Sequence, residues 1–198
     1  GPLPDKKGAT FEGGSRVPGI SRCRGHTKAG ETSDEPVIGL DLLPTLCAIT
    51  GTPMPTDRAI DGSSFLPIFD GKPIQRKTPL YWHFNAAQNK AKVAMRIGDW
   101  KILAHLTGPE QTGGADIRAA DEQAFKTAEL DTFELYNLRD DIGESRDLSS
   151  QEPERLKALS AILRKRYHEV RDESPVWPEW EWPRYEGKRI EWPPYRGK

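Results

Sequence analysis

The chain has 198 residues, of which 35% are hydrophobic and 30% are charged. These fractions indicate a modest core for the length, with a considerable part of the chain in loops or tails. The formal net charge of −1, from 29 basic and 30 acidic residues, excludes a global field that would attract nucleic acid or an anionic membrane. No apolar run approaches the roughly 20 residues that a membrane helix needs.

The two cysteines, Cys23 and Cys47, allow one disulfide, but they exclude a disulfide framework and a clustered zinc site. They do not identify a redox compartment. Residue 1 is a glycine in a loop-like segment. We therefore expect the sequence to be the interior of a longer protein, so the lack of a signal peptide says nothing about secretion.

The most informative segment is the run KKGATFEGGSRVP at residues 6–18. Its three glycines allow the backbone to approach another group closely, because glycine has no side chain to obstruct it. Lys7, beside the first of them, can act as a point charge for an oxyanion such as sulfate or phosphate. Lysines in glycine-rich loops are more often only solvated, so this interpretation needs support from downstream.

Residues 17–75 have the pattern of a strand, a polar loop, a helix and a long connection. The strand is expected at residues 17–20, a short apolar run that a proline interrupts. Residues 52–77 hold four prolines and several turn residues, which is typical of a connection over the surface.

The helix of this region is predicted over residues 41–51. Asp41 suits its N-terminus and Gly51 suits its C-terminal cap. At helical spacing, one face carries three apolar side chains: Leu42, Leu46 and Ile49. We expect this face to pack on a core.

Strand signals dominate residues 78–138. Aromatic and alternating apolar stretches predict four strands, at residues 80–84, 93–97, 100–103 and 133–136. Gly98 and Asp99 form a tight-turn signal between the second and the third strand. A helix follows from Pro153, with leucines at helical spacing. The economical interpretation is a four-stranded antiparallel sheet with one helix packed on it.

The tail from residue 173 is rich in tryptophan and proline, and residues 181–188 recur in similar form at residues 191–198. Prolines exclude a regular helix there. We interpret the tail as an extended strap whose aromatic rings pack on the parent surface. The alternative is a strip that binds a glycan or a protein partner.

Five segments, taken together, resemble the C-terminal part of the type I sulfatases, which are arylsulfatase-like enzymes of the alkaline phosphatase superfamily. They occur in the family's order, at residues 7–18, 33–46, 60–67, 93–101 and 134–138. The first resembles the family's lysine segment, Lys-Gly-x-Thr-aromatic-Glu-Gly-Gly-x-Arg-x-Pro. The resemblance covers about residues 1–148.

This resemblance implies an α/β, alkaline-phosphatase-like fold. The chain would then hold the end of the large α/β domain and a small four-stranded antiparallel sheet packed on a helix. Residues 1–77 are expected to be the C-terminal portion of the catalytic domain, and residues 78–172 a small α+β subdomain. Residues 173–198 are expected to be the extended tail.

The resemblance also implies hydrolysis of sulfuric esters, with small-molecule or carbohydrate sulfates as substrates. Ca²⁺ and a formylglycine nucleophile belong to the family's chemistry, in which lysines and histidines neutralise the sulfate. Lys7 is thereby implied as a catalytic cation that contacts the substrate sulfate, and His83 is the candidate substrate contact. For His83, and equally for His105, a structural or solvated histidine is the alternative.

The rest of that machinery is not found in the sequence. Neither Cys23 nor Cys47 lies in the Cys-x-Pro-x-Arg motif that formylglycine formation needs. No Asp-Asn-Gly segment provides a calcium site, and the Asp140-Asp141 pair has the pattern of a turn. We therefore expect no metal ligands here, a nucleophile and calcium ligands upstream, and no activity from this chain alone.

Two other functions remain open. One is a binding module that uses the Trp/Tyr-rich tail, which residues 1–75 disfavour because they offer little to bury their helix. The other is a related hydrolase of phosphate or phosphonate esters, which the match to the lysine segment disfavours. By family resemblance, the expected location is periplasmic, secreted or lysosomal.

Overall fold

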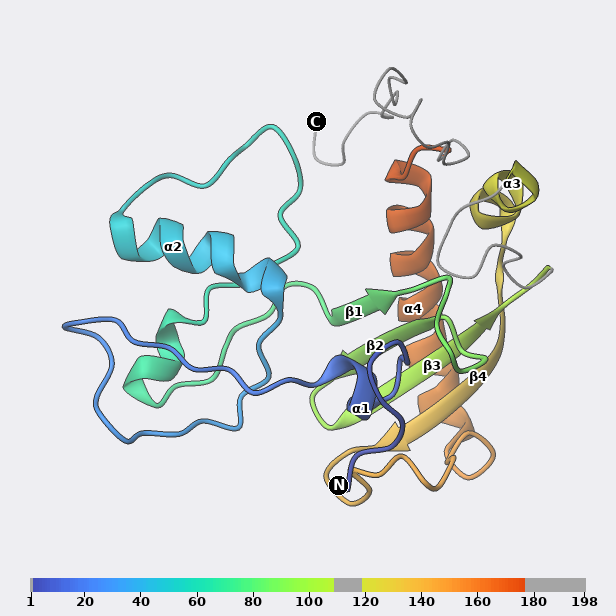
Figure 1. Cartoon of the computed structure of the whole chain (residues 1–198), viewed down its shortest axis with the longest axis horizontal. Helices are drawn as coiled ribbons and strands as arrows, with labels where there is room; N and C mark the ends of the chain where they lie inside the picture. The colour runs from blue at the N-terminus through green and yellow to red at the C-terminus, as the bar shows by residue number, and fades with distance from the viewer. Residues whose placement is uncertain (1, 109–118, 177–198) are drawn as a thin grey trace. The chain divides into compact units, whose positions relative to one another are not determined.

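The computed structural model describes residues 2–108 and 119–176, and these form two compact units (Figure 1). The sheet unit contains residues 2–16 and 81–176, and the helix unit contains residues 17–80. The strap and the glycan-binding strip that the sequence suggests at residues 177–198 lie outside the described residues.

The sheet has four strands in the order β1-β2-β3-β4, namely β1 (Leu80–His83), β2 (Val93–Ile97), β3 (Trp100–Leu106) and β4 (Leu130–Asn137). Antiparallel pairing places Met95 opposite Ile102, and Ile102 opposite Leu135. Gly98, with a φ of 58°, makes the tight turn between β2 and β3. The four predicted strands and their antiparallel arrangement are confirmed, and β3 and β4 extend further than predicted.

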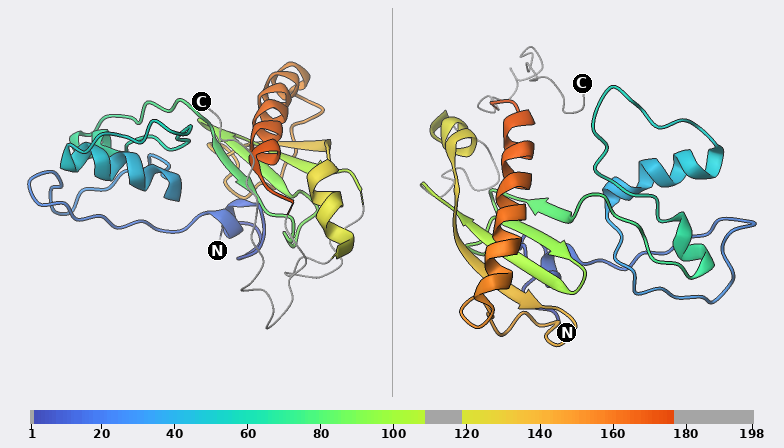
Figure 2. Two further views of the ribbon diagram at one scale, coloured as in Figure 1. Left: turned by 90° about the horizontal axis from the view of Figure 1, so that it is seen from above. Right: turned by 180° about the vertical axis from the view of Figure 1, so that it is seen from behind.

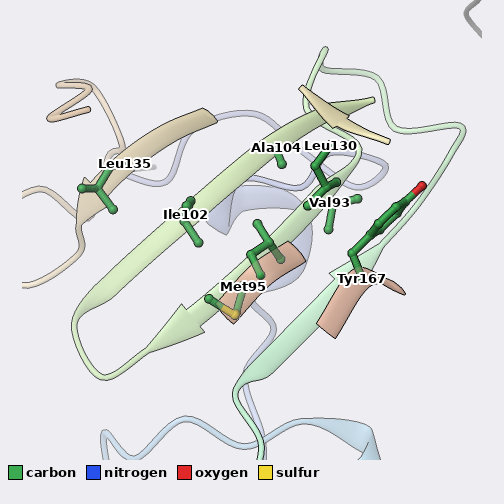
Figure 3. Close-up of a cluster of buried hydrophobic side chains, with 8 residues drawn as sticks. Val93, Met95, Ile102, Ala104, Leu130, Leu135 and Tyr167 are labelled. Atoms are coloured by element: carbon green, nitrogen blue, oxygen red, sulfur yellow. The ribbon is translucent and has the colours of Figure 1, made fainter. Parts of the chain in front are cut away.

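Helix α4 (Pro153–Glu173) covers one face of this sheet, as predicted (Figures 1 and 2). Alternate strand residues and two α4 side chains form the main core (Figure 3): Val93, Met95, Ile102, Ala104, Leu130, Leu135, Leu163 and Tyr167. The Tyr167 hydroxyl donates to the Ala128 carbonyl at 2.9 Å, so its buried polar atom is satisfied.

The opposite face of the sheet is covered by residues 2–16, which include the short helix α1 (Glu12–Ser15) (Figure 2). Phe11 packs there on a second cluster and meets the Tyr136 ring edge-on, with the ring centroids 6.2 Å apart. Trp82, from β1, joins the same cluster. The lysine segment is therefore one layer of the sheet unit.

The helix unit contains 3₁₀ turns at η1 (Gly39–Asp41) and η2 (Leu66–Asp70) and the helix α2 (Leu42–Thr50). The predicted helix is confirmed, including Gly51 as its left-handed cap with a φ of 68°. The predicted strand at residues 17–20 is wrong. These residues are irregular, with Val17 79% and Ile20 100% exposed, so no neighbouring backbone pairs with them.

The described residues do not cover the face of α2 that the sequence predicts to pack on a core. Leu42 and Leu46 are 54% and 57% exposed, whereas Pro44, Thr45 and Cys47 are buried. Hydrogen bonds explain this orientation. The Thr45 hydroxyl donates to the Asp41 carbonyl at 2.7 Å and accepts a hydrogen bond from the Phe65 amide at 2.9 Å. These bonds turn the threonine side of α2 toward the connector.

Helix α3 (Ala119–Thr127) lies between β3 and β4, in a stretch for which the sequence analysis predicts no helix. Its Lys126 ammonium donates to the Arg171 carbonyl at 2.7 Å, near the carboxyl end of α4. Such a contact satisfies carbonyls that a helix leaves free at its end. In the described part of the chain, no helix is long and apolar enough to span a membrane.

Candidate functional site

Lys7 lies in the exposed turn that precedes α1. Within residues 2–108 and 119–176, no side chain pairs with its ammonium group. The next residue, Gly8, has a φ of 96°, a conformation that residues with a side chain rarely adopt. This turn presents an unpaired cation to its surroundings, which is the arrangement that an anionic substrate group needs.

The loop between β1 and β2, residues 85–92, holds the lysine turn in place and is called loop 85–92 below. The Gln88 amide donates to the Gly8 carbonyl at 2.8 Å, and the Gln88 side chain donates to the Lys7 carbonyl at 3.4 Å. Because these bonds use only backbone atoms of the turn, they fix its path and leave the Lys7 ammonium free.

Thr10 and Asn89 continue this attachment with a reciprocal pair of bonds. The Thr10 amide donates to Oδ1 of Asn89 at 2.9 Å, and Nδ2 of Asn89 donates to the Thr10 hydroxyl at 2.8 Å. The same hydroxyl donates to the Ala91 carbonyl at 3.0 Å. Thr10 is buried, and this loop provides the hydrogen-bond partners of its amide and its hydroxyl.

Gly13 and Gly14 permit two close backbone approaches within the segment. A Cβ atom on Gly13 would lie 2.0 Å from the Pro4 carbonyl oxygen, and one on Gly14 would lie 2.1 Å from the Ala9 carbonyl oxygen. Both distances are far below van der Waals contact. The two glycines that the sequence linked to close approach therefore serve the folding of the segment on itself.

Glu12 anchors the segment to the sheet through a buried charge cluster. Its Oε1 lies 2.9 Å from Nζ of Lys101, a β3 residue with no exposed side-chain surface. Nζ of Lys101 also lies 3.0 Å from Oε1 of Glu144, and the Glu12 amide donates to Oε2 of Glu144 at 2.5 Å. Arg16 adds a contact of 3.0 Å to Oε2 of Glu12.

Burial and charge act in opposite directions on the two carboxylates. Burial alone would raise the pKa of Glu12, but Lys101 and Arg16 bring that pKa below its ordinary value. Burial also raises the pKa of Glu144, and there it outweighs the attraction of Lys101. Lys101 lies within ion-pair distance of both carboxylates, at 2.9 Å from Glu12 and 3.0 Å from Glu144.

His83 ends β1 on the face that α4 covers. Its ring packs against Tyr167 at a centroid distance of 5.5 Å, and its Nε2 lies 2.9 Å from Oδ1 of Asn85. Burial lowers the pKa of His83, although the bond to Asn85 opposes this, so the ring is neutral at neutral pH. The structure places Lys7 and His83 on opposite faces of the sheet, and a role of His83 in substrate binding stays a prediction.

His105 belongs to a polar group that the sequence did not predict as a unit. Its Nε2 lies 2.7 Å from Oε1 of Glu134, and the Tyr136 hydroxyl donates to Oε2 of the same carboxylate at 2.7 Å. The antiparallel register between β3 and β4 places these residues on one face. Alternation along both strands is the signal that points to this grouping.

No group of three metal-ligating side chains occurs among the described residues. The Asp140-Asp141 pair lies in a turn, as predicted, and Oδ2 of Asp141 accepts the Ser145 amide at 2.8 Å and the Arg146 amide at 2.9 Å.

Curated relatives of the chain are sulfatases. Human steryl-sulfatase is 38% identical over 87 residues, which are 43% of this chain and 15% of that protein. Human arylsulfatase A is 32% identical over 164 residues, which are 79% of this chain and 31% of that protein. Mouse N-acetylgalactosamine-6-sulfatase is 30% identical over 171 residues, which are 81% of this chain and 31% of that protein. The chain thus spans less than a third of the length of these relatives.

Solved structures agree on the fold. One, from work on glycosaminoglycan metabolism by Bacteroides thetaiotaomicron, has a TM-score of 0.60 and 21% identity over 84% of this chain and 32% of its own. Ps i-CgsB in complex with k-i-k-neocarrahexaose has a TM-score of 0.55 and 22% identity, and the match covers 93% of this chain and 38% of that chain. No family model matches the chain. The relatives and the fold show that the chain belongs to the sulfatase family and corresponds to the C-terminal part of a sulfatase.

Proposed function

We propose that the complete protein hydrolyses sulfate esters, and that Lys7 contacts the substrate sulfate. The observation that carries this proposal is the exposed ammonium of Lys7, which has no side-chain partner among the described residues and lies on a turn that loop 85–92 and Glu12 hold in place. The sulfatase relatives supply the reaction class. A preorganised turn matters because a catalytic cation is effective only when it is already aimed at the developing charge.

Lys7 has a simple role in this proposal. Cleavage of a sulfate ester breaks the bond between sulfur and the bridging oxygen, and that oxygen departs with the bonding electrons. Negative charge grows on it and is shared with the sulfuryl oxygens. A fixed ammonium near these oxygens lowers the barrier, and removal of one such donor costs about 10²- to 10³-fold in turnover in other enzymes.

The nucleophile and the metal are proposed to come from another part of the protein. Family resemblance implies formylglycine and Ca²⁺, but Cys47 is buried in α2 and Cys23 lies in an irregular segment. Among the described residues, no three His, Cys, Asp or Glu side chains gather where they could hold a metal ion. No step of the reaction is therefore assigned to this chain beyond the cation. Export to a periplasm, a lysosome or the exterior is part of the same proposal.

The test is a turnover assay on the complete protein with 4-nitrophenyl sulfate and 4-nitrophenyl phosphate. We expect sulfate hydrolysis, and a loss of about 10²-fold or more in kcat for Lys7→Ala. Lys6→Ala is the matched control, because the Lys6 side chain is also exposed. A Lys7→Ala enzyme with full turnover would remove Lys7 from the mechanism. Preference for the phosphate ester would instead favour the related phosphate hydrolases.

A further inference from the structure

The direction of the Lys7 side chain depends on the backbone that flanks it. Among the residues that the structure describes, no side chain pairs with the Lys7 ammonium. Within the turn, the Ala9 amide donates to the Lys6 carbonyl at 3.1 Å, and Gly8 has a φ of 96°. A cation on such a turn is aimed only as precisely as the turn itself is held.

Thr10, three residues after Lys7, is the most firmly held point of this backbone. Its amide and its hydroxyl both bond to the side-chain amide of Asn89, at 2.9 and 2.8 Å, and its hydroxyl also donates to the Ala91 carbonyl at 3.0 Å. The residue is only 3% exposed. Bonds to both the backbone and the side chain fix the position of Thr10 and also its rotation.

Asn89 is in turn held by a lysine of its own loop. Nζ of Lys92 donates to the Asn89 carbonyl at 3.0 Å and to the Ala87 carbonyl at 2.6 Å. The Lys92 amide donates to the carbonyl of Ala104, a fully buried β3 residue, at 3.0 Å. The Asn89 side chain therefore reaches Thr10 from a loop that is closed on itself and attached to the sheet.

Gln88 contacts the lysine turn more directly, but it holds it less tightly. Its side chain is exposed and lies 3.4 Å from the Lys7 carbonyl, which is a long hydrogen bond. Its shorter bond, at 2.8 Å to the Gly8 carbonyl, comes from the backbone amide and does not depend on the side chain. Asn89 is therefore the side chain of this loop whose identity matters most for the turn.

We propose that Asn89 is a positioning residue of the sulfatase reaction, which holds the Lys7 ammonium at the substrate sulfate through its paired bonds to Thr10. This inference rests on the proposed function of Lys7. Asn89 itself makes and breaks no bond in the reaction. Its contribution is preorganisation, because displacing a catalytic group by about 1 Å can cost about 10²-fold in rate.

The first experiment measures turnover of 4-nitrophenyl sulfate by the complete protein. Asn89→Ala should lower kcat by about tenfold or more, and by less than Lys7→Ala does. In the Lys7→Ala background, the same substitution should change kcat by less than about twofold, because the group that Asn89 positions is already gone. A further tenfold loss in that background would overturn the proposal, since a merely structural role lowers turnover in both backgrounds.

Thr10 provides a second, independent comparison. Thr10→Val removes the hydroxyl that accepts from Nδ2 of Asn89, so Thr10→Val and Asn89→Ala delete one bond in common. The double variant should therefore lose less kcat than the product of the two single losses. Thr10→Ser keeps the hydroxyl and should restore most of the turnover that Thr10→Val loses. Fully multiplicative losses, or no rescue by serine, would contradict the coupling of the two residues.

Asn137→Ala is the matched control. Oδ1 of Asn137 accepts the Arg139 amide at 3.1 Å, and its Nδ2 donates to Asp140 at 2.9 Å. These are the same two roles that Asn89 has, in a turn outside loop 85–92 and outside the lysine turn. The control should leave kcat within about twofold of the unaltered protein. Equal losses in Asn137→Ala and Asn89→Ala would show a general effect on folding and would overturn the proposal.

The second experiment needs no turnover and uses NMR of the 198-residue chain. Asn89→Ala should shift the amide signals of Lys7 and Gly8 and speed their hydrogen exchange, and Asn137→Ala should leave both unchanged. Unchanged signals at Lys7 in Asn89→Ala would overturn the proposal. Full turnover in Lys7→Ala, or no hydrolysis of the ester by the unaltered protein, would instead refute the proposed function, and the NMR comparison would still decide whether Asn89 holds the turn.

Discussion

Nζ of Lys101 lies 2.9 Å from Oε1 of Glu12, and the two side chains are 0% and 3% exposed. This ion pair joins β3 to the segment that carries Lys7. A buried pair of this kind contributes less to stability than its geometry suggests, because both ions lose their hydration. Its structural effect is to fix the position of the segment on the sheet.

Replacing Lys101 with methionine should be strongly destabilising. The change leaves Glu144 buried without its cation, and Arg16 remains as a close partner of Glu12. Breaking a buried ion pair by removing one partner costs about 3–5 kcal/mol. The measurement is the free energy of unfolding of the chain in urea. Lys165→Met, on the exposed side of α4, is the control and should change it little. A loss below about 1 kcal/mol for Lys101→Met would show that the pair is not a specific anchor.

Gly14→Ala should displace the lysine turn. The added Cβ would lie 2.1 Å from the Ala9 carbonyl oxygen, so the backbone has to move. We expect a loss of about 1–3 kcal/mol in the free energy of unfolding, together with altered amide signals at Lys7 and Gly8. NMR of the chain measures both.

The matched control for that change is Gly19→Ala. Nothing lies within 4 Å of a Cβ atom built on Gly19, and its φ is not in the left-handed region. The control should be neutral or slightly stabilising, because alanine restricts the unfolded chain. Equal effects of the two substitutions would contradict the close approach at Gly14.

Acid should weaken the helix unit through Asp41. Burial would raise the pKa of Asp41, but bonds from Arg76 and from the Ser63 and Ile38 amides bring it below its ordinary value. The folded state thus holds the carboxylate ionised, while the unfolded state binds a proton more readily. The stability that Asp41 contributes is present above its ordinary pKa and is lost as the pH falls through the lowered one.

The measurement is the stability of the helix unit at about pH 6 and about pH 3.5, followed by amide protection at Ile38 and Ser63. Asp41→Asn should reduce stability at the higher pH and weaken the dependence on pH. Asp70→Asn serves as the control, because the Asp70 side chain is 72% exposed and lies 3.9 Å from its partner Lys72. An unchanged pH dependence in Asp41→Asn would refute the role of this carboxylate.

Substitutions on the two faces of α2 should have different effects on the free energy of unfolding. In the chain, Leu46→Gln should change the free energy of unfolding by less than about 0.5 kcal/mol, because the side chain is 57% exposed. Thr45→Val should cost about 1–3 kcal/mol, because the Phe65 amide loses its acceptor.

The same pair of variants tests the predicted domain assignment of residues 1–77. If α2 belongs to a larger α/β domain, Leu46→Gln should become destabilising in the complete protein, by about 2–3 kcal/mol. Thermal unfolding of the chain and of the complete protein measures the difference. An equally small effect in both would contradict the assignment.

The sheet and α4 could be predicted from the sequence because their signals are local. Aromatic and β-branched residues alternate along the strands, and Pro153 opens a run of leucines at helical spacing. The buried face of α2 could not be predicted in this way. Its side chains turn inward because Thr45 bonds to Phe65, a contact between residues 20 positions apart.

The candidate site shows the same limit. Lys7 could be identified from its resemblance to the lysine segment of the sulfatases, but its supports could not. Lys101 was a charged residue in a strand without a known partner, and Asn89 was a loop residue like any other. Both become intelligible only when the fold brings them to Glu12 and Thr10, at separations of 89 and 79 positions.

These separations have a consequence for the order of events during synthesis. The Glu12 amide bonds to Glu144, which leaves the ribosome 132 residues later. Contacts this distant in sequence form late, since the intervening chain must be closed into a loop first. A nascent chain therefore exposes the Lys7 segment, with its glycines and the Glu12 carboxylate, until β3, β4 and the turn at Glu144 have emerged. The docking of the Glu144 turn is then also the step that holds the lysine turn in place.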